Sequence, residues 1–384
     1  MREIDDPKQL EAWLEAGTEP CVAVQSLHLD PYAEALGAAS LEGSVFIACR
    51  ASRELAGAIV KRGALWFSAI DDFTFPTHRA RLYTPDELFE GFEPEDSKGY
   101  QRTFDHRVFA EYEAHGRERT SSIVVSLARR LHDHSITDAL EELIEGRSVV
   151  AIMGGHGMER RDPMYAGVAR IARTLTRHGF LLVSGGGPGA MEATHLGAYF
   201  APRDDADLDA ALEMLAPRPA EAKPGKEYAD ADWLHRAWAV RERFAIPAGR
   251  EAEALSVGVP TWLYGHEPPA VFATQIAKYF ANSVREDGLL SIASHGVIYA
   301  PGSAGTTQEI FQDVTQNHYA TTGWVSPMIL FGRDHWTNKR PVWPLLEKLG
   351  VGELFGELLA LTDDEGEVVR RIRMYDPDLY RVPS

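Results

Sequence analysis

The sequence predicts an α/β protein whose main part is a doubly wound parallel sheet, preceded by a smaller domain. Two observations carry this prediction. From residue 147 onward, short continuous apolar runs alternate with segments of helical periodicity, and glycine-rich turns join strand to helix at two places. Continuous apolar runs are typical of strands buried on both faces, as parallel strands are. Their alternation with helices is the pattern of an open α/β sheet.

Residues 1–115 are expected to form a separate N-terminal domain of α/β or β-rich character. One helix is predicted over 7–16, and short apolar runs at 21–24, 44–48 and 64–70 are separated by turn residues. This part of the chain carries no functional motif that we recognise, and its role stays open.

Residues 116–146 carry apolar side chains at helical spacing and are predicted to be a helical linker. The stretch His132, Asp133, His134 lies within it and could suggest a metal site. A polar turn between two helices is the favoured interpretation, because no further ligands stand at a recognisable spacing.

Residues 147–384 are predicted to form the sheet domain, and an insertion at 201–250 interrupts its alternation. Strands are expected at 148–153, 180–184, 296–300, 327–331 and 358–361. Helices are expected at 163–177, 191–200, 271–283, 306–319, 342–349 and 365–372, and inside the insertion near 205–215 and 230–244.

The composition limits the classes of function. The 384 residues include 39 basic and 57 acidic side chains, which gives a net charge of −18. A surface that grips nucleic acid polymers or membranes is normally basic, so neither is expected as a partner, whereas a small phosphorylated ligand stays compatible. Two cysteines cannot make a disulfide scaffold, no apolar run approaches ~18 residues, and no secretory leader is recognised, so we expect a cytoplasmic protein.

Two glycine-rich turns hold most of the chemical information. The first reads S-G-G-G-P-G-A-M-E at 184–192 and the second P-G-S-A-G-T-T-Q-E at 301–309. Each lies where a predicted strand ends and a helix begins, which is where open α/β sheets bind ligands. Glycines let the backbone approach a phosphate, and the N–H groups of a helix N-terminus point at it. The candidate binding residues are Gly185, Gly186, Gly187, Gly189, Ala190, Met191, Glu192, Pro301, Gly302, Ser303, Ala304, Gly305 and Thr306.

A phosphate-binding role is favoured over three alternatives for these turns. A single glycine-rich turn is as often a plain chain reversal as a binding site, but two such turns at equivalent positions favour binding. Residues 185–190 formally match the dinucleotide fingerprint G-x-G-x-x-G/A. That motif also needs an acidic residue about 20 positions later, at the end of the next strand, but Asp204 and Asp205 follow no predicted strand. Neither turn continues into the Gly-Lys-Ser/Thr of nucleoside triphosphatases.

Glu309 is the candidate catalytic residue. It lies about one turn into its predicted helix, so its carboxylate can point back over the loop at 302–305. There it could stabilise positive charge developing on a sugar carbon, or position and deprotonate an attacking water. The alternative is an acidic side chain that merely complements the helix dipole.

These turns resemble those of the LOG family, formerly described as lysine decarboxylases, whose signature is P-G-G-x-G-T-x-x-E. Ser303 stands where that signature has its second glycine. The turn at 185–193, G-G-G-P-G-A-M-E-A, is closer to longer bacterial relatives that hydrolyse purine and pyrimidine nucleotides. The resemblance covers about residues 147–375.

The resemblance implies a Rossmann-like fold and a homodimer or higher homo-oligomer. It also implies hydrolysis of the N-glycosidic bond of a nucleoside 5′-monophosphate to free base and ribose 5-phosphate, with no cofactor or metal. The resemblance implies two catalytic residues: the family's glutamate maps onto Glu309 and its arginine onto Arg285, whose guanidinium suits a phosphate. Glu286 replaces the lysine that usually follows this arginine, so a solvated helix-end charge is the alternative for Arg285. The first strand-to-helix turn of the family corresponds to Gly154, Gly155 and His156, which are expected to touch the nucleotide.

The run Y-G-H-E-P-P at 264–269 has two interpretations. Glycine and prolines make a rigid turn, and His266, Glu267 and Lys278 supply polar groups nearby, so the run could line the base or phosphate pocket. Equally, it could be a structural crossover before the predicted helix at 271–283. His266 and Glu267 lack the second histidine of a zinc motif.

The leading hypothesis is therefore a nucleotide N-glycosidase with Glu309 as its carboxylate. The alternative is a non-catalytic nucleotide sensor, which Ser303 and the replaced lysine favour. An amino acid decarboxylase is disfavoured, because no lysine stands in a context suited to a pyridoxal Schiff base. These residues do not determine which base is recognised.

Overall fold

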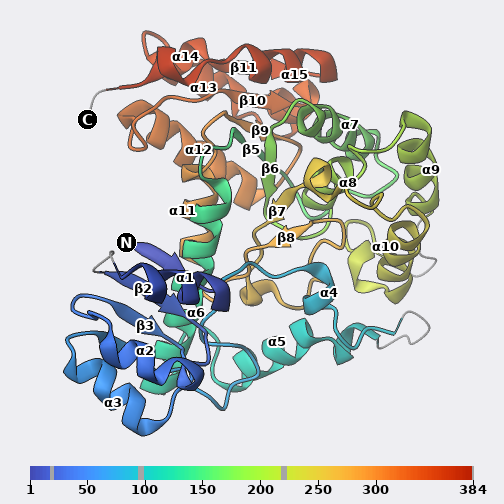
Figure 1. Ribbon diagram of the computed structural model, residues 1–384. Helices are drawn as coiled ribbons and strands as arrows, with labels where there is room; N and C mark the ends of the chain where they lie inside the picture. The colour runs from blue at the N-terminus through green and yellow to red at the C-terminus, as the bar shows by residue number, and fades with distance from the viewer. Residues whose placement is uncertain (18–20, 94–98, 218–222, 383–384) are drawn as a thin grey trace. The chain divides into compact units, whose positions relative to one another are not determined.

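The computed structural model describes residues 1–17, 21–93, 99–217 and 223–382, and the chain divides into two compact units. The first unit comprises Met1–Leu82 and Ala114–Glu142, and the second comprises Tyr83–Glu113 and Leu143–Ser384. Each unit has its own parallel β-sheet, of four and seven strands respectively (Figure 1). The predicted α/β class is confirmed for both.

The first unit alternates short strands and helices. Its strands pair in the order β1-β2-β3-β4, all parallel, and its core contains Leu10, Trp13, Val24 and Phe46. The strands are β1 (Arg2–Ile4), β2 (Val22–Gln25), β3 (Val45–Ile47) and β4 (Leu65–Phe67), and the helices are α1 (Pro7–Ala16), α2 (Ala33–Ala38), α3 (Arg53–Lys61) and α6 (Ile123–Ile144). Of the two expectations for this part, α/β or β-rich, the first is correct.

The stretch His132, Asp133, His134 lies in the middle of α6, so the expected turn between two helices is absent there. His132 and Asp133 are buried, and the His132 Nδ1 lies 3.2 Å from an Asp133 carboxylate oxygen. Polar residues inside a helix can be buried when they find partners, and spacing alone does not reveal those partners. Within the described residues, no group of three or more His, Cys, Asp or Glu side chains has the arrangement of a metal site.

The segment 83–113 packs with the second unit, although the sequence suggested that it belongs with residues 1–82. Tyr83 and Ile276 exchange two backbone hydrogen bonds, of 3.0 and 2.7 Å. Asp105, in α5 (Phe104–Ala114), forms a buried ion pair of 2.6 Å with Lys278. These partners lie more than a hundred residues away, so local pattern could not assign the segment. The same segment includes α4 (Pro85–Leu88).

The second unit is a doubly wound sheet, as predicted. Its strand order is β11-β10-β9-β5-β6-β7-β8, and all neighbours are parallel. The strands are β5 (Val149–Met153), β6 (Leu181–Ser184), β7 (Ser256–Gly258), β8 (Gln275–Ile276), β9 (Val297–Tyr299), β10 (Met328–Phe331) and β11 (Leu359–Thr362). The chain proceeds from β5 toward one edge and then returns to place β9 on the other side of β5. Ligands of such sheets bind outside the carboxyl ends of the strands at this reversal.

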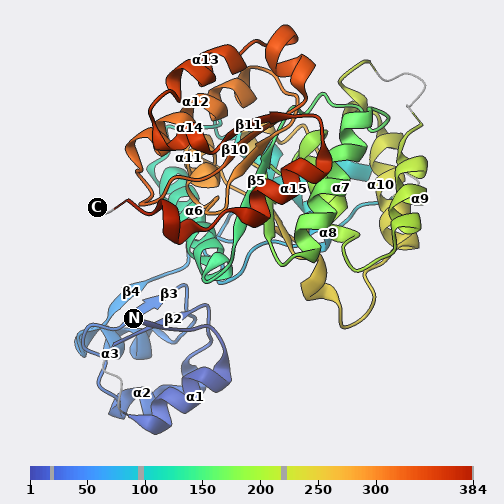
Figure 2. The same cartoon turned by 90° about the horizontal axis from the view of Figure 1, so that it is seen from above.

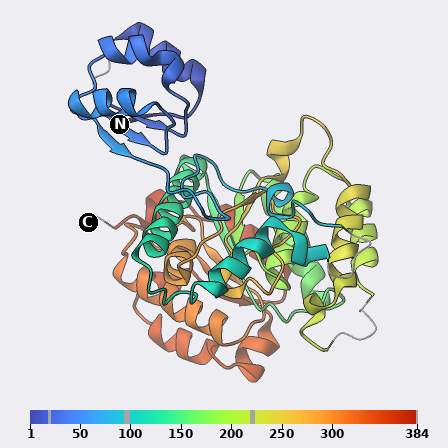
Figure 3. The ribbon, with the colours of Figure 1, turned by 90° about the horizontal axis from the view of Figure 1, so that it is seen from below.

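Helices connect these strands. α7 packs on α8 and α15, and α11 packs on α12 (Figure 2). The insertion contributes α9 and α10, which lie side by side at the rim of this unit (Figure 3). The helices are α7 (Pro163–Arg177), α8 (Ala190–Tyr199), α9 (Asp205–Leu215), α10 (Ala231–Arg243), α11 (Asn282–Ser291), α12 (Ala304–Tyr319), α13 (Trp343–Leu349), α14 (Leu354–Glu357) and α15 (Glu365–Met374).

The prediction of a helix at 271–283 is wrong. That stretch contains β8 and buried loop, and α11 begins only at Asn282. Phe272 and Ala277 are fully buried, and the Ala277 N–H donates to the Gly258 carbonyl at 2.8 Å. A short apolar run fits a buried helix or a buried strand equally well by periodicity. Strand β7 was missed for a different reason: it is three residues long and reads Ser-Val-Gly, so it carries no apolar run.

Elsewhere the predicted elements agree with the structure to within a few residues. Helix α7 begins after Asp162, whose carboxylate accepts the Met164 N–H, and Pro163 occupies its first position. Among the described residues, no helix combines the length and apolar character needed to cross a bilayer.

Candidate functional site

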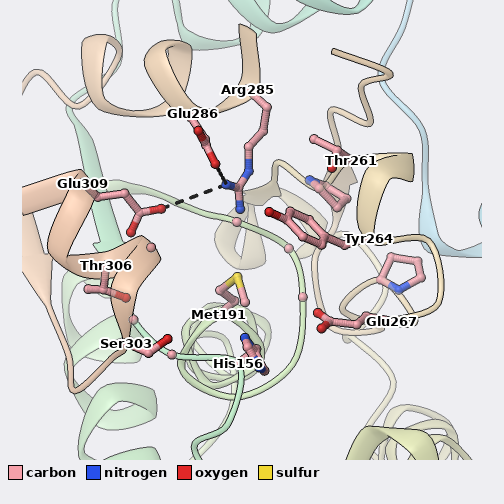
Figure 4. Close-up of a pocket in the computed structure, with 18 of the residues that line it drawn as sticks. His156, Met191, Thr261, Tyr264, Glu267, Arg285, Glu286, Ser303, Thr306 and Glu309 are labelled. Atoms are coloured by element: carbon pink, nitrogen blue, oxygen red, sulfur yellow. Dashed lines mark ion pairs between the residues drawn. The ribbon is translucent and has the colours of Figure 1, made fainter. Parts of the chain in front are cut away.

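A cavity of about 230 Å³ opens at the carboxyl ends of β5, β6, β7 and β9, at the reversal point of the sheet. Both glycine-rich turns and α11 contribute to its wall. Of the residues predicted from sequence, those that line it are Gly154, Gly155, His156, Gly185, Gly186, Gly187, Met191, Arg285, Ser303, Gly305, Thr306 and Glu309 (Figure 4). Residues more than a hundred positions apart thus surround one space.

The first turn requires its glycines. Gly186 and Gly189 each have a φ of +71°, a region that side chains disfavour. A Cβ on Gly186 would lie 2.7 Å from the Pro260 ring, and one on Gly189 would collide with the Gly155 carbonyl. The Ala190 N–H donates to that carbonyl at 3.2 Å. This close approach holds the start of α8 against the turn that follows β5.

The second turn is joined to the same point. The Gly155 N–H donates to the Pro301 carbonyl at 3.0 Å, and a Cβ on Gly302 would collide with Thr306. Helix α12 begins at Ala304, and its first N–H groups have no partner inside the helix. The starts of α8 and α12 therefore both border the cavity, and helix N-termini favour anions.

Glu309 and Arg285 face each other across the upper part of the cavity (Figure 4). The Arg285 Nη1 lies 4.0 Å from the Glu309 carboxylate, and the two side chains are 12% and 15% exposed. Burial raises the pKa of Glu309 to about 7; the nearby Arg285 opposes this shift and Glu286 adds to it. A carboxyl group with such a pKa can exchange a proton near neutral pH.

Arg285 is held in place by backbone. Its Nε donates to the Val259 carbonyl at 3.0 Å, after strand β7. A Cβ on Gly185 would lie 2.5 Å from the Arg285 Nη2 and 2.6 Å from the Met191 sulfur, so glycine at 185 makes room for both side chains. Neighbouring Glu286 accepts hydrogen bonds from the side-chain amides of Asn282, at 2.7 Å, and Gln308, at 3.3 Å.

Six predicted binding residues do not line the cavity: Gly189, Ala190, Glu192, Pro301, Gly302 and Ala304. Five of them lie within the two turns or at the helix starts. Glu192 is different, because it is fully buried and accepts hydrogen bonds from Arg160, at 2.8 and 2.5 Å, and from Tyr165, at 2.8 Å. Glu192 follows Met191 by one position in the helix, so its side chain points about 100° away from the direction of Met191, which faces the cavity. A contact between Glu192 and a ligand is therefore not supported.

The run 264–269 lines the cavity through Tyr264, Glu267, Pro268 and Pro269, in agreement with the first of its two interpretations. Lys278 does not reach the cavity, because its ammonium group is buried against Asp105. Sequence reasoning missed Pro260 and Thr261, which also line it. They follow β7, whose sequence Ser-Val-Gly carries no apolar run, so the hydrophobic pattern gives no signal for them.

Comparisons with known proteins do not assign the chain to a family. No family model matches it, and no curated protein does. Similar solved structures include the molybdenum cofactor binding protein of Rippkaea orientalis, with 13% identity, a TM-score of 0.37, and coverage of 60% of this chain and 97% of that one. Two structures of the molybdenum cofactor carrier protein of Chlamydomonas reinhardtii have 13% and 15% identity and TM-scores of 0.35, and each covers 59% of this chain and 96% of the other. Likenesses at these TM-scores carry no conclusion about function.

Proposed function

We propose that the second unit hydrolyses the N-glycosidic bond of a nucleoside 5′-monophosphate, as its resemblance to the LOG family suggests. The observation that carries the proposal is the buried Glu309 carboxylate, 4.0 Å from Arg285, in a cavity bordered by two helix N-termini. Helix N-termini bind anions such as a phosphate, and a carboxyl group with a pKa near neutrality can act as a general base, so both features support the proposal.

The phosphate is assigned to the turn at Ser303–Thr306, where the N–H groups at the start of α12 are available. Arg285, held by the Val259 carbonyl and 4.0 Å from Glu309, adds a fixed positive charge to the wall of the same cavity. The ribose then lies next to Glu309, which stands one turn further along the same helix.

The chemical step adds water across the bond between C1′ and the base. Glu309 accepts a proton from the water as its oxygen forms a bond to C1′, and the C1′–N bonding electrons leave with the base. The base nitrogen takes up a proton from solvent and Glu309 releases its own to solvent, so the products are free base and ribose 5-phosphate and the carboxylate is restored. Ionised Glu309 also stabilises the positive charge that develops on the sugar ring.

A nucleotide sensor without catalysis is the second candidate. Ser303 replaces a glycine of the family signature, and Arg285 lies 3.9 Å from Glu286, so part of its charge is balanced within the protein. A site of this kind would bind nucleotide without turning it over. The homo-oligomer and the cytoplasmic location are likewise proposals that rest on the resemblance and the composition.

The test is an incubation of the purified chain with AMP, GMP, IMP, CMP and UMP, followed by chromatography for free base and ribose 5-phosphate. We expect product, and we expect Glu309→Gln to slow its formation by about 10²–10⁴-fold. Glu347→Gln, which removes an exposed carboxylate on α13, is the matched control and should react normally. Binding without product would favour the sensor, and full activity in Glu309→Gln would contradict the assigned role of that residue.

A further inference from the structure

Besides Glu309 and Glu286, a third glutamate lines the cavity: Glu267 faces it from the side opposite Glu309 (Figure 4). Its side chain is only 14% exposed. The turn that carries it is rigid: the Glu267 N–H donates to the Tyr264 carbonyl at 2.8 Å, and the Ala270 N–H donates to the Gly186 carbonyl at 2.7 Å. Glu267 is therefore held at a fixed place beside the first glycine turn.

The neighbours of Glu267 leave it acceptor capacity. The imidazole of His266 lies 3.9 Å away and is 60% exposed, so it neutralises the carboxylate weakly. Tyr228, from the insertion, hydrogen-bonds to Glu267; burial, and secondarily this carboxylate, raise the pKa of its phenol to about 12. A carboxylate offers about four acceptor positions, and one phenol occupies one of them.

The surroundings of Glu267 suit a flat ring. Tyr264, Pro268 and Pro269, from the same turn as Glu267, line the cavity, and so does His156, whose ring makes a T-shaped contact with Tyr228 at 6.0 Å between centroids. Aromatic and proline surfaces of this kind pack against the faces of nucleobases.

The geometry of the proposed reaction places the base on this side. Water that Glu309 activates must approach C1′ from one face of the sugar, and the base leaves from the opposite face. Glu309 lies at one side of the cavity, so the base extends toward Tyr264 and Glu267.

On the basis of the proposed function, we propose that the substrate is a guanine nucleotide and that Glu267 selects it. Guanine presents two adjacent donors, the N1–H and the 2-amino group, that match the two oxygens of one carboxylate. Hypoxanthine lacks the amino group, and adenine, cytosine and xanthine each place an acceptor beside a donor, which a carboxylate repels. Discrimination by one bidentate pair is worth roughly ten- to a hundredfold in affinity.

The experiment measures binding by calorimetry to the full chain carrying Glu309→Gln, so that the nucleotides stay intact. GMP should bind roughly ten- to a hundredfold more tightly than IMP. Adding Glu267→Gln should abolish this preference: it should weaken GMP more than IMP, which keeps only the N1–H donor, and leave the affinity for ribose 5-phosphate unchanged. Since an amide offers one acceptor and one donor, the same variant should gain affinity for xanthosine 5′-monophosphate. Adding Glu347→Gln instead, as the matched control, should change none of these affinities, and circular dichroism checks that each variant is folded.

Three results would overturn the inference. Equal affinities for GMP and IMP would exclude selection by Glu267 while leaving the proposed function intact. Equal weakening of GMP and ribose 5-phosphate by Glu267→Gln would mean that this carboxylate binds the ribose hydroxyls instead of the base. Absence of binding by every nucleotide and by ribose 5-phosphate would overturn the proposed function together with the inference.

Discussion

Glu309 shows how one side chain acquires reactivity from its surroundings. Burial opposes its ionisation, Arg285 at 4.0 Å favours it, and Glu286 opposes it again. Burial is the largest of the three effects, so the pKa lies near 7, well above that of an exposed glutamate. The carboxylate is thus basic enough to accept a proton from water and is still ionised in part at neutral pH.

This pKa predicts the pH dependence of the proposed reaction. Only ionised Glu309 can accept the proton, so kcat/KM should rise with pH and level off above about 8. At pH 6, about a tenth of the molecules would be ionised, so the rate should be about tenfold below its plateau. Steady-state rates between about pH 5 and 9 measure this profile.

A substitution at the neighbouring Glu286 tests whether the pH profile reports the ionisation of Glu309 or that of another titrating group. Glu286→Gln removes a negative charge that raises the pKa of Glu309, so the rising limb should move to lower pH. Asp313, whose pKa burial also raises to about 7, has no such dependence on Glu286. The phosphate of the substrate titrates identically with both proteins. If the rising limb of the pH profile stays at the same pH in Glu286→Gln, the profile reports the ionisation of a group other than Glu309.

At the scale of elements, α8 links the cavity wall to the insertion. Met191 faces the cavity, and the next residue, Glu192, pairs with Arg160 in the interior. Arg160 also donates to the Trp233 carbonyl of α10 at 2.7 Å and lies 4.0 Å from the Trp233 ring centroid. This buried pair therefore joins the glycine turn to the insertion without entering the site.

Replacing Glu192 should affect stability more than binding. Glu192→Gln removes the carboxylate that pairs directly with the buried Arg160 and leaves only the Coulombic attraction of Glu227, so we expect a loss of about 3 kcal/mol in the free energy of unfolding. Urea denaturation followed by circular dichroism measures it. Glu365→Gln, which breaks the half-exposed pair with Arg170, is the control and should cost less than about 1 kcal/mol. If the Glu192→Gln protein is folded but binds nucleotide more weakly, Glu192 is a binding residue after all.

At the scale of the whole molecule, the net charge of −18 and the proposed anionic ligand oppose each other. Long-range repulsion acts on a nucleotide in solution, whereas the helix N-termini and Arg285 attract it within the cavity. The repulsion comes from the charge summed over the whole protein and dominates far from the surface, whereas the attraction dominates only close to the cavity. Association and final affinity should therefore respond differently to salt.

We expect the association rate of a nucleoside monophosphate to rise with ionic strength. Raising the salt from about 0.01 M to about 0.15 M shortens the Debye length from about 30 Å to about 8 Å and screens the repulsion. Stopped-flow measurements on Glu309→Gln should show an increase of a few fold, with the uncharged nucleoside as the control. A decrease would show that the attraction from the cavity reaches further than the repulsion.

The sequence alone determined the class of the fold, most of the strands and helices of the sheet domain, and the two turns that meet at the cavity. These features depend on local periodicity and on glycine, and both can be read from neighbouring residues. The tertiary structure decided which segment joins which unit, that 271–283 is not a helix, that Glu192 points inward, and that Glu267 lies opposite Glu309. Each of these depends on contacts between residues far apart in the chain, because burial and strand order arise only when distant segments pack together.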